Sequence, residues 1–207
     1  MPKFGNLKLH KNKPTIIAEV GVNHECDLKL AKKYINLVNK AKADAIKFQT
    51  YKAELIASKN SPAYWDLSEE KISSQFRLFK KYDKFDLKDY TELKKICDKK
   101  KLNFMTSLFD TENVDRYNNL IKVFKISSSD ITNVPLLRKI GSKKKHVIIS
   151  TGASTINEIK FALKKLNLPK NKVCLMHCVL NYPTKYENAN LNYISVLKKK
   201  FPGYLIG

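Results

Sequence analysis

The chain has 207 residues, of which 43% are hydrophobic, and this is enough to build one domain around a core. Its 40 lysines and arginines against 19 acidic residues give a formal net charge of +21, but with 10% aromatic residues the composition excludes a disordered chain. No apolar run approaches the roughly 20 residues that cross a bilayer, and no apolar stretch of a secretory signal follows the first residues, so we expect a cytoplasmic protein with no membrane partner.

Short runs rich in β-branched residues alternate with longer amphipathic segments, which is typical of repeated strand–helix–strand units. The pattern predicts strands at residues 15–19, 45–49, 103–107, 123–126, 146–150 and 173–178, and the start of a seventh at 204–207. It predicts helices at residues 28–42, 87–100, 112–119, 135–140, 155–166 and 191–199. Residues 51–85 are expected to form a long excursion, part loop and part short helix.

Repeated units of this kind build either a (β/α)8 barrel or a doubly wound open sheet. The G-x-G-x-x-G of dinucleotide-binding sheets does not follow the first predicted strand. Polar side chains stand at or just after the carboxyl ends of successive strands, which converge on one mouth in a barrel: Glu19, Lys47, Gln49, Ser107, Lys125, Ser128, Ser150 and His177. We therefore predict an α/β fold, an incomplete TIM (β/α)8 barrel with about six β/α units plus the start of a seventh strand.

Lysine and serine side chains at this mouth form a donor-rich bowl that suits a phosphate or a carboxylate: Lys47, Ser107, Lys125, Ser128 and Ser150. A buried ammonium group without a counter-charge is costly, so an anionic ligand is its natural partner. For Lys47 the alternative is an internal ion pair with Glu19.

Further residues near the mouth are candidates for contact with a polar substrate. Glu19 is a candidate general base or acceptor for a sugar hydroxyl, unless its role is to neutralise Lys47. Tyr182 lies on the loop after the sixth strand, where it either lines a polar pocket or packs the loop against a helix. His24 also lies on a loop near the mouth, with a functional and a turn-forming role equally open.

The positive charge does not by itself predict a nucleic-acid partner. Only three of the basic residues are arginines, and 37 are lysines, whereas base and phosphate recognition favours the planar fork of arginine. The lysine runs at 99–101, 143–145, 164–165 and 198–200 end predicted helices, where they complement the helix dipole. We expect no nucleic acid, and a basic nucleic-acid-binding protein is the less favoured alternative.

The four cysteines show no C-x-x-C spacing, which indicates reduced thiols. Cys174, His177 and Cys178 suggest a metal cluster, but on one strand the two thiols would lie about 13 Å apart. They cannot then bind one zinc ion together. We therefore predict that both cysteines pack in the interior, that the chain itself holds no metal, and that His177 points into the mouth.

Five segments of the sequence resemble the sialic acid synthase family, which includes N-acetylneuraminate synthase and its legionaminate and pseudaminate relatives. They run in family order with family-like spacing from about residue 14 to the last residue: IIAEVGVNHECD, ADAIKFQTYKAE, FKISSSDITNVPLL, VIISTGAST and HCVLNYPTKYENANL. One of them alone is a weak signal, but the set is highly specific.

The resemblance implies a reaction between phosphoenolpyruvate and an open-chain N-acylated hexosamine, N-acetylmannosamine or a 6-deoxy diacetamido analogue. C3 of the enol attacks the sugar aldehyde, water adds at C2, and phosphate leaves by C–O cleavage. A divalent metal, manganese or magnesium, polarises the aldehyde in the family. Full-length family members are homodimers in which a C-terminal antifreeze-like domain caps the partner's site.

The resemblance also implies roles for particular residues. Five match positions that hold phosphoenolpyruvate, although the family has a threonine at the second of them: Lys47, Ser107, Lys125, Ser128 and Ser150. Glu19 matches an acidic residue beside the reacting carbons, so Glu19 and Lys47 are the expected catalytic residues. The expected sugar-binding residues are Glu19, Gln49 and Tyr182.

Some positions depart from the family pattern. Cys26 replaces a glycine, Leu108 a common proline, and Leu180 a polar residue beside the ligand, while Ser127 and Ser129 stand where smaller residues are frequent. The family's two metal-binding histidines would lie beyond residue 207. We therefore expect the 207 residues to be the N-terminal part of a TIM-barrel synthase domain, truncated, inactive and poorly soluble on its own. The alternative is a non-catalytic fragment that retains anion binding.

Overall fold

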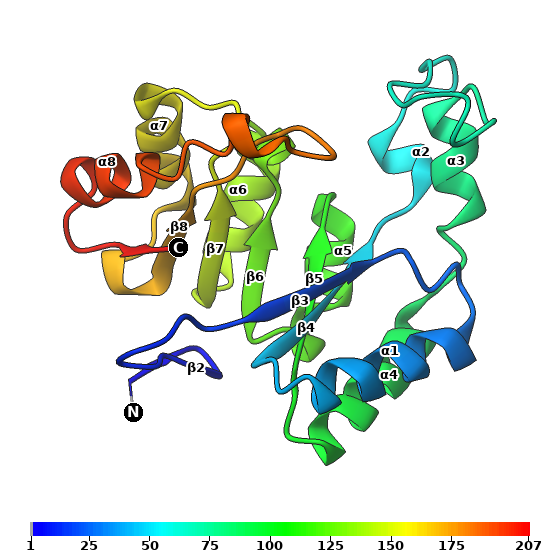
Figure 1. Cartoon of the computed structure of the whole chain (residues 1–207), viewed down its shortest axis with the longest axis horizontal. Coiled ribbons are helices and arrows are strands. Elements are labelled where there is room, and N and C mark those ends of the chain that lie inside the picture. Colours follow the sequence, from blue (N-terminus) through cyan, green and yellow to red (C-terminus); the bar gives the residue numbers. More distant parts are fainter. Residues whose placement is uncertain (1) are drawn as a thin grey trace.

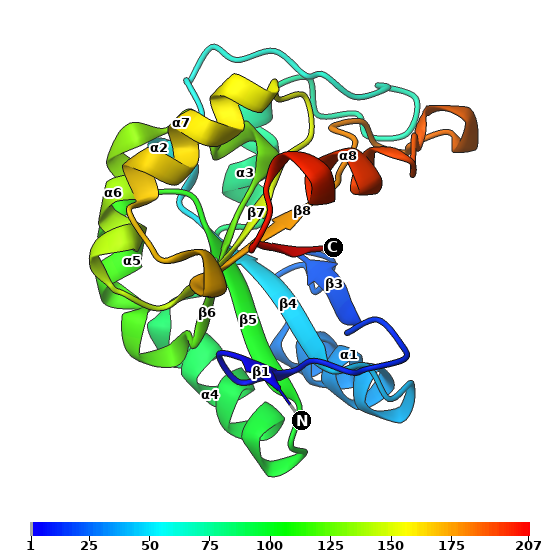
Figure 2. The same cartoon turned by 90° about the vertical axis from the view of Figure 1, so that its left-hand side faces the viewer.

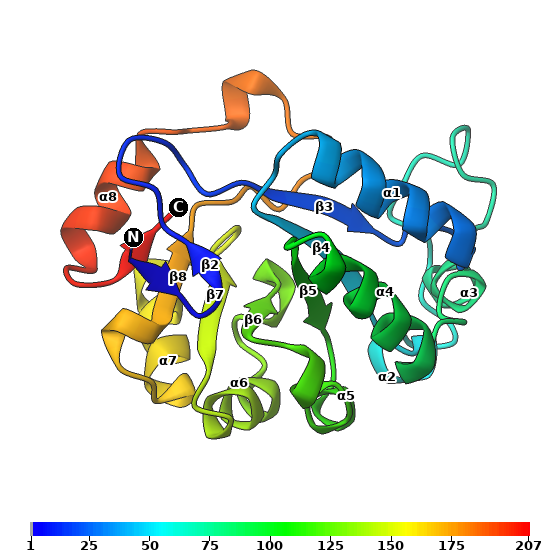
Figure 3. The same cartoon turned by 90° about the horizontal axis from the view of Figure 1, so that it is seen from below.

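Seven parallel strands form one curled sheet in the computed structural model, which describes residues 2–207 (Figure 1). Each strand pairs with the next along the chain, in the order β3 (Ile17–Gly21), β4 (Ala45–Thr50), β5 (Asn103–Leu108), β6 (Val123–Ile126), β7 (His146–Ser150), β8 (Val173–Met176) and β9 (Leu205–Ile206). Figure 3 shows the sheet bending around a hollow, with helices on its outer side. The predicted incomplete (β/α)8 barrel is confirmed, and so are its seven strands, with shifts of one or two residues at their ends.

Helices follow the strands and cover the convex face of the sheet: α1 (Leu28–Lys40), α4 (Leu87–Lys99), α5 (Thr111–Arg116), α6 (Val134–Ser142), α7 (Ile156–Leu166) and α8 (Tyr193–Lys200). Side-chain caps start most of them. Asp86 and Asp89 form a capping box at α4, and Thr155 and Glu158 form another at α7. Lysines occupy the last turns of α4, α7 and α8, which confirms that the lysine runs lie at helix ends.

The excursion after β4 contains two short helices, α2 (Ala53–Ile56) and α3 (Gln75–Lys81), as expected for part loop and part helix. Asp83 fixes this segment to the barrel. Its buried carboxylate accepts a hydrogen bond from the Ala53 backbone N–H at 3.0 Å, and its carbonyl accepts one from Lys52 Nζ at 2.5 Å. These two hydrogen bonds fix both ends of the segment next to the carboxyl end of β4.

An N-terminal hairpin that the sequence pattern did not predict closes the floor of the hollow. Its strands, β1 (Lys3–Phe4) and β2 (Leu7–Lys8), turn at Gly5, which has a φ of +62°. Phe4 and Leu7 are buried against the inward-facing side chains of the sheet: Ala45, Met105, Val123, Ile148 and Cys174. The lower part of the hollow is thus a packed apolar core, and its polar side chains lie in the upper part.

Gly141 of α6 lies close against the end of α7. A Cβ atom built on Gly141 would lie 2.0 Å from the carbonyl oxygen of Leu166 and 2.9 Å from its carbonyl carbon. The obstacle is backbone at the end of α7, which no side-chain rotation can remove. Gly141 therefore sets the distance between the two helices.

Two consecutive residues of the loop between β3 and α1, Glu25 and Cys26, have left-handed backbone conformations with φ values of +50° and +59°. Such a conformation costs a residue with a Cβ atom roughly 1–2 kcal/mol, and glycine adopts it freely. Replacing Cys26 with glycine should therefore raise the free energy of unfolding by about 0.5–1 kcal/mol, because relief of strain exceeds the loss of a half-buried thiol.

Thermal and urea unfolding of Cys26→Gly measure this gain, which corresponds to roughly 2–4 °C in Tm for a domain of this size. The matched control is Cys97→Gly, which makes the same change inside helix α4 at a fully buried position and should be strongly destabilising. A lower stability of Cys26→Gly than of the wild type would contradict the expectation.

Candidate functional site

Two strand ends bring the first lysine of the site to a serine and a glutamate. The register pairs Glu19 of β3 with Lys47 of β4, and Gln49 of β4 with Ser107 of β5. The Lys47 side chain is buried, donates a hydrogen bond from Nζ to Ser107 Oγ at 3.1 Å, and forms an ion pair with the Glu19 carboxylate. The ion pair that the sequence left open is therefore present, and it crosses from one strand to the next.

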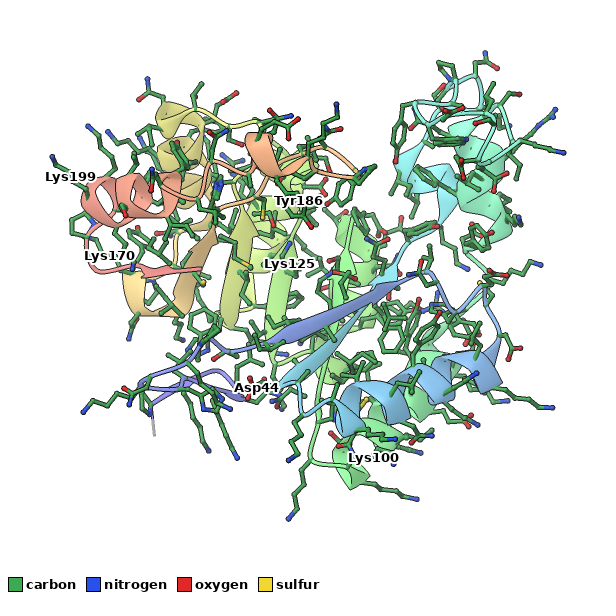
Figure 4. The ribbon with its side chains drawn as sticks, viewed as in Figure 1. Asp44, Lys100, Lys125, Lys170, Tyr186 and Lys199 are labelled. Carbon is green, nitrogen blue, oxygen red and sulfur yellow. The ribbon has the colours of Figure 1, made fainter. Side chains whose placement is uncertain are left out.

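The second lysine lies deep in the hollow two strands further on, where Lys125 of β6 donates to Ser150 Oγ of β7 at 2.6 Å (Figure 4). Lys125 Nζ also donates to the carbonyl of Ile126 at 3.3 Å. Ser150 in turn accepts a hydrogen bond from the Cys178 thiol at 3.3 Å. Because Ser107 pairs in register with Lys125, both lysine–serine pairs stand at the same depth.

Loops from three strands meet behind this group at Gly152. Its backbone N–H donates to Ser128 Oγ at 3.0 Å. A Cβ atom at this position would lie 2.9 Å from Ser128 Oγ and 3.0 Å from both the Cys178 carbonyl oxygen and the Leu180 nitrogen. Glycine is thus required for the close approach that holds Ser128 next to the lysine–serine pairs.

We call Lys47, Ser107, Lys125, Ser128 and Ser150 the anion cup. Burial, and then the positive charge of Lys47, lower the pKa of Lys125 to about 8. Of the two ammonium groups, only that of Lys47 is ion-paired within residues 2–207, with the half-exposed carboxylate of Glu19, and this leaves positive charge at Lys125. An anion bound between the lysines would favour the charged form of Lys125, so the cup is suited to a phosphate or a carboxylate.

The residues expected on the sugar side divide into two groups. Gln49 lies beside Glu19, since a Cβ atom on Gly21 would be 3.7 Å from both Gln49 Cδ and Glu19 Oε1. Tyr182 is instead 87% exposed, on the loop between β8 and α8, and makes no side-chain hydrogen bond to the rest of residues 2–207. The structure therefore joins Glu19 and Gln49 to the anion cup and leaves Tyr182 at its rim.

Two expectations about the sixth predicted strand are wrong. The strand β8 ends at Met176, so the alternation of its faces does not extend to residues 177 and 178. Cys178 does not pack in the interior: it is half-buried and contacts the cup through Ser150. His177 points away from the cup, because its Nε2 is 2.7 Å from the Ala189 carbonyl and its ring packs on Tyr193, in a groove of about 820 Å³ that Cys178 also lines.

His24, for which a functional and a turn-forming role were both open, is fully buried in the loop between β3 and α1. Its ring stacks on Phe85 at a centroid distance of 4.5 Å, and its Nδ1 accepts a hydrogen bond from the Cys26 N–H at 3.1 Å. The Nε2 atom is buried and has no hydrogen-bond partner in the described chain. Burial lowers the pKa of His24 to about 4, so the ring is neutral at physiological pH.

Among residues 2–207 no group of three or more histidine, cysteine, aspartate or glutamate side chains is placed to hold a metal ion. These residues therefore do not fit the divalent cation that the family resemblance implies. Within the same residues no helix has both the length and the apolar character to cross a membrane.

Known proteins with related sequences include synthases of nonulosonic acids. The chain is 39% identical over 195 residues to an N,N'-diacetyllegionaminic acid synthase of Campylobacter jejuni, a match that covers 91% of the chain and 58% of that protein. A protein of the same name from Legionella pneumophila is 34% identical, with 90% of the chain and 54% of the relative covered. The chain thus spans little more than half the length of these relatives.

A solved structure confirms the relationship at the level of the fold. The N-acetylneuraminic acid synthetase of Leptospira borgpetersenii, determined in complex with citrate, superposes with a TM-score of 0.82 at 34% identity, over 100% of this chain and 68% of the other. A model of the NeuB family matches residues 34–207, which include all the cup residues. The chain belongs to the NeuB family.

Proposed function

We propose that this chain carries the phosphoenolpyruvate site of a nonulosonic acid synthase, which condenses phosphoenolpyruvate with an N-acylated hexosamine. One observation carries the proposal: two lysine–serine pairs, one buried and one part-buried, stand at the same depth of the hollow, and only Lys47 is ion-paired, with Glu19, within residues 2–207. A small molecule with both a phosphate and a carboxylate complements two separated ammonium groups. Family membership and the names of the relatives support the same reaction class.

In the proposed reaction a bond forms between C3 of phosphoenolpyruvate and the aldehyde carbon of the open-chain sugar. The electrons of the aldehyde C=O bond move to its oxygen, which takes up a proton. Water adds at C2, its proton is removed, and the C2–O bond breaks to release inorganic phosphate. Lys47 and Lys125 hold the acid in place, and Glu19, already paired with Lys47, is the acid–base residue closest to the reacting carbons.

The roles of the remaining residues follow from their positions. Ser107, Ser128 and Ser150 supply hydroxyl donors around the bound acid, while Gln49 lies next to Glu19 on the side where the sugar must approach. Tyr182 at the rim contributes to the sugar side. The proposed partners are therefore phosphoenolpyruvate and an N-acylhexosamine, with a homodimer as the proposed assembly of the family's full-length chains.

Replacing Lys125 with methionine should weaken phosphoenolpyruvate binding by roughly 10- to 100-fold, because the acid loses one charge-assisted contact in a desolvated site. Isothermal titration calorimetry of the 207-residue chain with phosphoenolpyruvate measures this change. The control Lys33→Met removes the same charge from an exposed position on α1 and should leave the affinity unchanged.

Equal affinities of Lys125→Met and Lys33→Met would show that the chain attracts phosphoenolpyruvate only through its net charge, and would refute the anion cup. Release of inorganic phosphate on addition of N-acetylmannosamine to the chain and phosphoenolpyruvate would report the condensation itself.

A further inference from the structure

Residues 61–75, within the excursion after β4, form a closed loop at the end of the barrel where the anion cup opens. The ends of the loop are tied together by a bridge between Pro62 and Ser74 and by the hydrogen bond from the Ala63 N–H to the Ser73 carbonyl at 2.9 Å. Gln75 adds a side-chain hydrogen bond to the Pro62 carbonyl at 2.9 Å. A loop with such a base keeps the same shape whether or not a ligand is present.

The chain's single tryptophan, Trp65, anchors the tip of this loop. Its indole N–H donates to the carbonyls of Glu70 and Ile72, at 3.2 and 3.1 Å. Tyr64 packs edge-on against the indole at a centroid distance of 5.1 Å, yet 74% of Tyr64 is exposed. A large aromatic ring is therefore held in a defined place while most of its surface faces solvent.

The loop that carries Tyr64 lies on the mouth side of the barrel, as does the connection that carries Tyr182 (Figure 1 and Figure 2). In Figures 1 and 2 the α2–α3 segment and the β8–α8 connection rise from the same end of the sheet, and in Figure 1 the tip of that connection points toward the α2–α3 segment. Burial, followed by the nearby Cys178, Glu19 and Tyr64, raises the pKa of Tyr182. Tyr182 thus has a residue of the cup's border and Tyr64 within electrostatic reach.

We propose that Tyr64 is a sugar-contacting residue and that Tyr64 and Tyr182 form two aromatic walls around the N-acylhexosamine. The inference rests on the proposed function, in which the acid fills the cup and the sugar lies above it. Glu19 and Gln49 border the cup on the β3–β4 side, so the sugar extends from them toward the rim. There the exposed large hydrophobic side chains of the closed loop and of the β8–α8 connection include Tyr64 and Tyr182.

The chemistry of the ligand fits this arrangement. An N-acylated hexose offers C–H groups and an acyl methyl group that pack on the face of an aromatic ring, and a carbonyl that accepts a hydrogen bond from a phenol. A ring held by the anchored Trp65 loses little conformational freedom when the sugar binds, which favours affinity. Phosphoenolpyruvate has no such groups, so Tyr64 should affect the sugar and leave binding of the acid unchanged.

Trp65 provides the signal for the test, because it is the only tryptophan and contacts Tyr64. The probe is N-acetylmannosamine, titrated into the chain with inorganic phosphate filling the cup, and the readouts are tryptophan fluorescence and calorimetry. We expect saturable fluorescence change in the wild type and about tenfold weaker sugar binding in Tyr64→Ala, with most of the affinity kept in Tyr64→Phe. The control Tyr186→Ala removes a ring that is 98% exposed on the β8–α8 connection and should bind as the wild type does.

Equal sugar affinities of Tyr64→Ala and the wild type would overturn the role of Tyr64, and so would the absence of any saturable binding by the wild type. Calorimetry with phosphoenolpyruvate separates this failure from a failure of the proposed function. If all Tyr64 variants bind phosphoenolpyruvate as the wild type does, the anion cup remains supported as the phosphoenolpyruvate site, whatever the sugar titration shows. If the wild type does not bind phosphoenolpyruvate, the proposed function itself is wrong. Circular dichroism of each variant verifies that the fold is retained.

Discussion

Gly141→Ala should lower the free energy of unfolding by about 3 kcal/mol, near the upper end of the range for overpacked cores. Two effects of opposite sign compete. Alanine favours a helix over glycine by about 1 kcal/mol, but its methyl group would lie 2.0 Å from the Leu166 carbonyl oxygen. Because the obstacle is backbone and a Cβ atom has no torsion angle that could move it away, relief requires that α6 and α7 move apart, which opens the apolar contact between them. The steric term therefore decides the sign.

Urea unfolding measured by circular dichroism gives the free energy difference. Ser142→Ala is the matched control, because it also introduces an alanine into α6, at the next position, which is exposed. It should change the free energy of unfolding by no more than about 0.5 kcal/mol. If Gly141→Ala were as stable as the wild type or more so, the gain in helix propensity would outweigh the clash with the Leu166 carbonyl. The distance between α6 and α7 would then not depend on the glycine.

Acidification from pH 7 to pH 5 should cost about 2 kcal/mol of stability through His24 alone. Burial lowers the pKa of its ring to about 4 in the folded chain, against 6.5 for an ordinary histidine. The unfolded chain therefore binds the proton first as the pH falls. The stability that the neutral His24 ring contributes to the folded chain is complete above pH 6.5. It is lost progressively between pH 6.5 and 4, at close to 1.4 kcal/mol per pH unit in the steep part.

His24→Phe keeps an aromatic ring against Phe85 but cannot be protonated, so its stability should fall less steeply over the same range. The remaining slope belongs to other groups such as His146, whose pKa is lowered by burial and by Lys172. Repeating both series at 0.5 M salt is the control, since salt screens surface charges and leaves the desolvation of a buried ring unchanged. Parallel pH profiles for the two proteins would rule out His24 as the source.

The alternation of apolar strands and amphipathic helices was enough to predict the barrel, because each unit obeys its own period. The N-terminal hairpin was not predicted, because each of its strands has only two residues, and alternation of apolar and polar residues cannot be recognised over so short a length. Gly5 was the available signal: a glycine between Phe4 and Leu7 is typical of a tight hairpin turn.

The strand-borne part of the site could be predicted for a similar reason. Lys47, Ser107, Lys125 and Ser150 lie on strands whose carboxyl ends must meet, so their meeting follows from the fold class. Cys178 and His177 were assigned wrongly because they follow the end of β8, where strand alternation no longer determines direction. Tyr64 went unnoticed because loop contacts such as those of Trp65 depend on chain closure that no local pattern reveals.

The hairpin at the floor has a practical consequence for biophysical measurements. Since β1 and β2 pack beneath the sheet, the described chain begins, at Pro2, on the opposite side from the mouth (Figure 1). A biotin or a short peptide tether attached ahead of Pro2 would present every immobilised molecule with its opening toward the flowing solution. Surface-based kinetics with small ligands would then be free of shielding by the sensor matrix.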